Sequence, residues 1–306
     1  MHRYLYSYVG NTYNNEQQSY ELVPIPGSNI TKAVLFAGHD NSGVGVLPML
    51  PRNTFLYLET DEPITSANRY QNLLLISQMV QLETGLPAEP VEIDTSAIHN
   101  FDEALSRYGS DVYYEPGVSY GGMVNTPDGI AKVATLCHFL NMASGEDATK
   151  FKNALQSFAW AQETSRVNPN LKYTLFMSLY LSSINQLADN PSPVCNSPLM
   201  CPDCGENLGK HKTSHASEMK DLVRHLITGK GADNFVALIG RLYHNLRSSY
   251  LHDGLLSGGE REGGFLAEFS SDDPRHIQLV EDMANVEVLN RILLGLFLQD
   301  RALNRA

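Results

Sequence analysis

The pattern of hydrophobic and polar positions divides the chain into a part that favours strands and a later part that favours helices. Up to about residue 62, short runs of β-branched and aromatic residues are separated by Pro, Gly and Asn, which is typical of strands joined by turns. These runs are residues 20–25, 32–37 and 54–59. The pattern therefore predicts a β-rich beginning.

A single helix is predicted after these strands. It opens near Asp61, where Pro63 suits a first turn, and it ends at Gly85-Leu-Pro87. Between these points, apolar residues recur close to the helical period of 3.6 residues. Residues 88–127 return to mixed strand and loop, and we expect a domain boundary near Asn125.

Beyond that boundary the period is helical almost throughout. Apolar stripes predict helices at 128–142, 147–164, 169–187, 217–228, 233–251 and 274–298. The expected fold class is α+β. A smaller β-rich α/β domain at residues 1–125 precedes a mainly helical bundle at residues 126–306.

Three of the four cysteines cluster in an insertion at about residues 190–215. Cys195, Cys201 and Cys204 lie within ten residues of one another, and Cys201-Pro-Asp-Cys204-Gly is a turn suited to holding two thiolates around zinc. His211 or His215 would complete a Cys₃His site. A site filled by protein ligands leaves no open position for catalysis, so the predicted zinc is structural.

Other roles for these cysteines fit less well. A disulfide conflicts with the cytoplasmic location predicted below. A thioredoxin-like redox pair requires a βα context that the sequence lacks here. The remaining cysteine, Cys137, lies on the apolar stripe of a predicted helix and is expected in the core.

Charge is distributed unevenly along the chain. The net charge of −12 argues against a general nucleic-acid coat protein, because phosphate binding relies on Lys and Arg. Residues 205–255, however, hold seven Lys/Arg and five Asp/Glu, a balance of +2, together with five of the ten histidines. This window is either a solvated helix face or a local anion site on an acidic protein.

No targeting or membrane segment is evident. The first residues lack an apolar signal core, and no apolar run approaches the length of a membrane span. These features predict a cytoplasmic protein without a membrane partner.

The basic window contains an arginine and a histidine five residues apart, Arg247 and His252. Arg247 has a planar donor fork suited to phosphate, and His252 titrates near neutral pH. On one helix a separation of five residues places the two side chains about 140° apart. One helix therefore does not close both groups on a single phosphate, whereas two copies meeting across a dimer axis would.

These residues carry a family resemblance. The string Leu242-Tyr243, Leu246-Arg247-Ser248, His252-Asp253-Gly254 resembles the Apea-like branch of HEPN domains, whose motif separates arginine and histidine by four to six residues. The resemblance covers roughly residues 128–300, and residues 68–87 are similar to a helix in that branch's amino-terminal region. It implies a HEPN-like helical bundle.

The resemblance also implies an activity. HEPN domains of this kind are dimeric, metal-independent endoribonucleases, often in toxin–antitoxin or antiviral defence systems. Arg247 would stabilise charge on the pentacovalent phosphorus, His252 would move a proton, and Ser248 would donate a supporting hydrogen bond. The expected partners are an RNA substrate, a second copy bound through the helical domain, and an antitoxin or defence protein.

Two other functions stay open. The chain departs from the family pattern at Ser248, at Asp253 and at Asn185 or a neighbouring position, where the family commonly has Glu. A catalytically inactive HEPN module that binds RNA or nucleotide, or mediates dimerisation, fits these departures. A zinc-stabilised interaction protein, in which Arg247 makes only a salt bridge, is the third alternative.

Overall fold

The computed structural model confirms the α+β class. Antiparallel strands dominate the first part of the chain and helices the second. The described residues are 1–8, 12–13, 19–38, 53–85, 89–96, 98–109, 126–127, 129–167, 173–188, 198–200, 207–210, 215–243 and 274–304.

A five-stranded sheet in the order β3-β4-β5-β1-β6 forms the centre of the first part. Its strands are β1 (His2–Tyr8), β3 (Ser19–Glu21), β4 (Ile30–Gly38), β5 (Asn53–Thr60) and β6 (Val91–Ile93). Every neighbouring pair is antiparallel, as is common in α+β folds, and the expected β-rich beginning is confirmed. A separate short parallel pair joins β2 (Thr12–Tyr13) to β7 (Thr126–Pro127).

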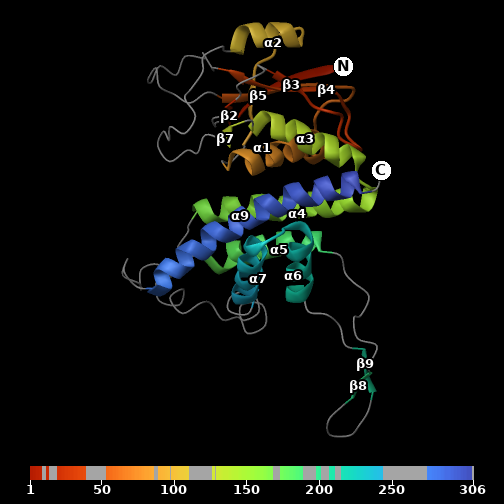
Figure 1. The fold of residues 1–306 in the computed structure, drawn as a ribbon. Coiled ribbons are helices and arrows are strands. Elements are labelled where there is room, and N and C mark those ends of the chain that lie inside the picture. The colour runs from red at the N-terminus through yellow and green to blue at the C-terminus, as the bar shows by residue number, and fades with distance from the viewer. Residues whose placement is uncertain are drawn as a thin grey trace. The chain divides into compact units, whose positions relative to one another are not determined.

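Helices cover both faces of this sheet (Figure 1). On one face, α2 (Phe101–Tyr108) packs on an aromatic cluster in which the Phe36 and Phe55 rings stack 5.2 Å apart. On the other face lie α1 (Leu75–Thr84) and α3 (Gly129–Met142). Because side chains alternate along a strand, both faces of the central strands are apolar and buried.

A close backbone approach connects the sheet to the end of α2. Gly38 and Gly109 form an isolated bridge. A Cβ added at Gly38 would lie 2.0 Å from the carbonyl oxygen of Tyr108. Only glycine permits this contact.

The predicted helix after the strands is present, but its predicted start near Asp61 is wrong, because residues 61–68 form bends and turns. It starts with a π-helical turn, η1 (Tyr70–Leu74), and continues as α1. Gly85 ends it with a left-handed φ of 73°, and its N–H donates to the carbonyl of Gln81 at 2.9 Å. Gly85 is therefore the helix C-terminus that the sequence predicted.

The helices of the second part also match the predicted stripes. They are α4 (Gly145–Val167), α5 (Tyr173–Leu187), α6 (His215–Leu226), α7 (Lys230–Leu242) and α9 (Pro274–Leu303). The predicted helix at 233–251 is described only as far as Tyr243. None of the described helices is long and apolar enough to span a membrane.

The chain divides into two units. Unit 1 contains residues 1–148 and 301–306, and unit 2 contains residues 149–300. The boundary expected near residue 125 lies within unit 1, because α3 packs beside α1. Cys137 on α3 is fully buried, and its thiol lies 3.6 Å from the sulfur of Met79 on α1, which confirms the prediction of a core residue.

Candidate functional site

The predicted catalytic residues lie outside the described part of the chain. Arg247, Ser248 and His252 fall between Tyr243, the last described residue after α7, and Pro274, the first of α9. Their mutual geometry therefore stays a prediction.

Most of the predicted zinc ligands also lie outside the described residues, namely Cys195, Cys201, Cys204 and His211. The flanking chain is described. Strands β8 (Pro198–Met200) and β9 (Asn207–Lys210) pair antiparallel, with Met200 opposite Asn207. This hairpin brings together the two ends of the segment that contains Cys201 and Cys204. No alternating pattern in the sequence predicts these two short strands.

His215 is the one predicted ligand whose surroundings are described. It is the first residue of α6, its side chain is half-exposed, and its Nδ1 lies 3.2 Å from a carboxylate oxygen of Glu218. Within the described ranges, no group of three or more His, Cys, Asp or Glu side chains is placed to hold a metal ion.

A polar groove lies between α7 and α9 in unit 2. Its volume is about 360 Å³. Its polar and aromatic lining consists of Asn234, Phe235 and Arg241 from α7 and of Gln278, Glu281 and Asn285 from α9. On α9 these residues recur every three or four positions, and on α7 Asn234 and Arg241 are seven positions, or about two turns, apart, so each set shares one face. We refer to this feature as the α7/α9 groove.

Arg241 is held in place at this groove by a buried carboxylate. Its Nη2 donates to Oδ1 of Asp282 at 2.8 Å, and Gln278 Nε2 donates to the same oxygen at 3.0 Å. The Asp282 side chain is 9% exposed, whereas that of Arg241 is 45% exposed. The guanidinium is therefore oriented from behind while much of it faces solvent.

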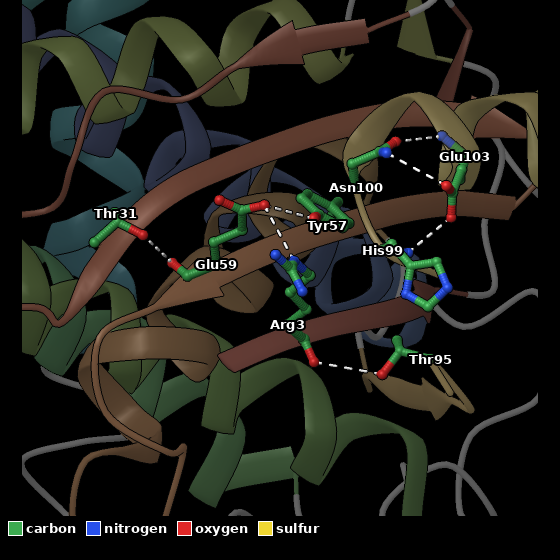
Figure 2. Close-up of polar contacts among 8 residues, drawn as sticks. All are labelled: Arg3, Thr31, Tyr57, Glu59, Thr95, His99, Asn100 and Glu103. Atoms are coloured by element: carbon green, nitrogen blue, oxygen red, sulfur yellow. Dashed lines mark hydrogen bonds and ion pairs between the residues drawn. The ribbon is translucent and has the colours of Figure 1, made fainter. Parts of the chain in front are cut away.

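A second polar cluster lies on the sheet of unit 1 (Figure 2). The Tyr57 hydroxyl donates to Oε1 of Glu59 at 2.7 Å, and Nε of Arg3 lies 3.6 Å from the same oxygen. Arg3 and Glu59 are direct partners in the register of β1 and β5. Burial, with the Glu59 carboxylate next in importance, raises the pKa of Tyr57. The phenol therefore stays protonated at neutral pH, and Arg3 and Glu59 form a cross-strand ion pair.

A separate group of contacts in Figure 2 lies at the start of α2. The Asn100 side chain accepts from the N–H of Glu103 at 2.9 Å, and the Glu103 carboxylate accepts from the N–H of His99 at 2.8 Å. This reciprocal arrangement caps a helix. The exposed His99 is thus next to a structural cap.

No sequence pattern identifies the groove residues as a site. Arg241 and Asp282 are separated by 41 positions, and no local pattern links them. Comparison with known proteins adds no function: no family model, curated protein or solved structure matches this chain.

Proposed function

We propose that this protein is a metal-independent endoribonuclease of the HEPN type that acts in the cytoplasm in a defence or toxin–antitoxin setting. The observation that carries the proposal is the sequence Arg247-Ser-Ser-Tyr-Leu-His252. It stands directly after α7 in a mostly helical unit, which is the context in which the motif is informative.

The proposed reaction starts with attack of a ribose 2′-hydroxyl on the adjacent phosphorus. As the new P–O bond forms, a proton leaves the 2′-oxygen, and the bond from phosphorus to the 5′-oxygen breaks. His252 takes the 2′-hydroxyl proton or donates a proton to the leaving 5′-oxygen, and water serves for the other proton transfer. Arg247 stabilises the additional negative charge on the equatorial oxygens, with Ser248 as a supporting donor. The products carry 2′,3′-cyclic phosphate and 5′-hydroxyl ends.

The test uses a mixed RNA pool in the presence of EDTA. Wild-type protein is expected to generate fragments with 5′-hydroxyl ends, which polynucleotide kinase labels without prior phosphatase treatment. Arg247→Ala and His252→Ala are each expected to lower the rate by about 100-fold or more, as is usual for loss of a charge-stabilising or proton-transferring group.

Matched control variants are available on the described surface. Arg224 is an exposed arginine on α6 paired with Asp221, and His99 is an exposed histidine beside α2. Arg224→Ala and His99→Ala should cleave at the wild-type rate. Cleavage that survives both Arg247→Ala and His252→Ala would refute the proposed mechanism.

The alternative is an RNA- or nucleotide-binding module without cleavage activity. Asn185 on α5 is at or next to the position where the family commonly has Glu, and its Oδ1 is buried without a hydrogen-bond partner among the described residues. An amide does not supply the charge of a carboxylate, but it accepts and donates hydrogen bonds. RNA binding by the wild type without cleavage would favour this alternative.

A structural zinc bound by Cys195, Cys201, Cys204 and either His211 or His215 is part of the proposal. The β8–β9 hairpin supports it, because pairing of the flanking strands limits the spread of the Cys201–Cys204 segment. Glu218 behind His215 also fits, since a carboxylate on one ring nitrogen commonly orients a histidine toward a metal through the other.

Metal removal tests the zinc site. We expect close to one zinc per chain by elemental analysis, and loss of that zinc in Cys201→Ser. Prolonged chelation should lower the melting temperature, because metal binding contributes to folding, while the initial cleavage rate stays unchanged. Cys137→Ser is the matched control and should retain its zinc. Zinc-free protein with an unchanged melting temperature would exclude a structural metal.

A further inference from the structure

The α7/α9 groove has the size and lining of a small-molecule site. Its volume of about 360 Å³ lies within the range of ligand pockets, which begins near 300 Å³. Its lining combines an arginine fork, three side-chain amides and one phenylalanine, each of which recognises flat, hydrogen-bonding groups.

Charge narrows the class of ligand. The groove contains Arg241, Glu281 and the Asp282 carboxylate behind Arg241, so its formal balance is one positive and two negative charges, or −1. A phosphate or carboxylate ligand would meet Glu281 without a surplus of cations. A neutral ligand avoids this repulsion, and amino groups on it would be favoured by the Glu281 carboxylate.

Shape and hydrogen bonding point to a nucleobase. Side-chain amides donate and accept at once, which matches the mixed edge of a base. Phe235 is half-buried, so its packing orients the ring, and aromatic rings of this kind stack on unpaired bases. Asp282 orients the Arg241 fork before any ligand arrives, which reduces the entropy lost on binding.

The groove also lies within reach of the proposed catalytic residues. Arg241 precedes Arg247 by six residues, so their Cα atoms are at most about 21 Å apart. A base bound in the groove and a phosphate held by Arg247 therefore fit on one short RNA strand.

We propose that the α7/α9 groove binds one unstacked nucleobase of the RNA substrate, with preference for a base that carries an exocyclic amino group. Glu281 accepts from that amino group, Phe235 stacks on the ring, and Arg241 with the amides of Asn234, Gln278 and Asn285 contacts the remaining edge. That the groove binds a nucleobase is independent of the proposed function. That this base belongs to the RNA substrate rests on the proposed function.

The experiment measures binding of free nucleosides, which lack phosphate and cannot be cleaved. Guanosine, adenosine, cytidine, uridine and inorganic phosphate are titrated into the full-length protein and followed by NMR. Saturable binding is expected for the first three nucleosides, and binding of uridine, which lacks an amino group, should be at least several-fold weaker.

Two variants test the proposed contacts. Phe235→Leu keeps an apolar side chain but loses the stacking face, and Glu281→Gln loses the carboxylate. Phe235→Leu should weaken binding about tenfold, and Glu281→Gln should remove the preference over uridine.

Asn285→Ala is paired with Asn153→Ala, which removes an exposed amide from α4 outside the groove. The first should weaken nucleoside binding and the second should not. Absence of nucleoside binding, equal binding by all variants, or displacement of the nucleoside by phosphate would overturn the proposal.

RNA cleavage is measured on the same protein samples to separate the two proposals. Nucleoside binding without RNA cleavage by the wild type would leave the groove assignment intact and reject the ribonuclease. RNA cleavage without nucleoside binding would reject the groove assignment alone.

Discussion

At the scale of single residues, burial changes the chemistry of Cys137. The thiol is fully buried beside Met79, and burial raises its pKa to about 12 from an ordinary value of 9.0. A thiol in this state is a poor nucleophile, because the thiolate is the reactive form. Cys137 therefore acts in packing, unlike the three clustered cysteines that we assign to zinc.

This pKa predicts how stability depends on pH. The folded thiol keeps its proton up to about pH 12, whereas the unfolded thiol loses it above about pH 9. The contribution of Cys137 to stability is thus complete below pH 9 and is lost as the pH rises from about 9 to 12. Between pH 8 and 10, we expect the unfolding free energy of the wild type to fall by about 1–2 kcal/mol more than that of Cys137→Ala.

The measurement is urea unfolding at the two pH values, followed by circular dichroism. Buried tyrosines such as Tyr8, whose pKa is raised by burial, are present in both proteins and cancel in the comparison. Identical pH dependence in the two proteins would contradict a buried, protonated Cys137.

At the scale of elements, the start of α4 depends on a side-chain cap. Ser144 Oγ donates to the Asp147 carboxylate at 2.6 Å and accepts from the Asp147 N–H at 3.2 Å. Substitution of such a cap by alanine costs about 1 kcal/mol. We expect Ser144→Ala to lower the unfolding free energy by that amount in urea titrations.

Ser106 supplies the control for the cap, because it is an exposed serine within α2. Ser106→Ala should change the unfolding free energy by no more than about 0.5 kcal/mol, since exposed helix positions away from a cap tolerate alanine. Equal losses in the two variants would show that the Ser144 hydrogen bonds do not stabilise α4.

The same scale shows which elements are predictable from sequence. Long helices such as α4 and α5 repeat apolar residues over several turns, and their positions were predicted within a few residues. The helix α2 and strands β8 and β9 were not predicted, and β6 was expected only as part of a mixed strand-and-loop region, because runs of three to eight residues contain too few periods for a signal. Their formation depends on neighbours that are distant in sequence, such as β1 for β6.

The candidate sites also differ in whether the sequence alone predicts them. Arg247, His252 and the cysteines are recognisable because their chemistry is concentrated in a short stretch of sequence. The α7/α9 groove is not, because its Arg241–Asp282 pair is formed only when two helices pack together. Sequence patterns identify local motifs, whereas a site made by tertiary packing requires the structure.

At the scale of the whole molecule, the division into two units determines which fragments of the chain are suitable for functional tests. Both α4 and α9 extend from one unit into the other, since the divisions fall at residues 148/149 and 300/301. Arg301 near the end of α9 lies 3.9 Å from Asp147, and both residues belong to unit 1. A fragment of residues 126–306 would remove α3 from α1 and expose Cys137, so functional tests should use the full chain.

The family resemblance and the five-residue separation of Arg247 and His252 predict that two chains form each active site, and complementation tests this prediction. Arg247→Ala and His252→Ala chains, carrying different affinity tags, are co-expressed and the mixed dimer is purified. If each site combines Arg247 of one chain with His252 of the other, a symmetric dimer has two such sites and the mixed dimer keeps one of them. Its RNA cleavage rate should then be about half that of the wild type, whereas each variant alone loses most of its activity.

If both groups act from the same chain, no site in the mixed dimer is complete and no activity returns. Recovery of activity would therefore support the dimeric arrangement, and its absence in a purified mixed dimer would reject it.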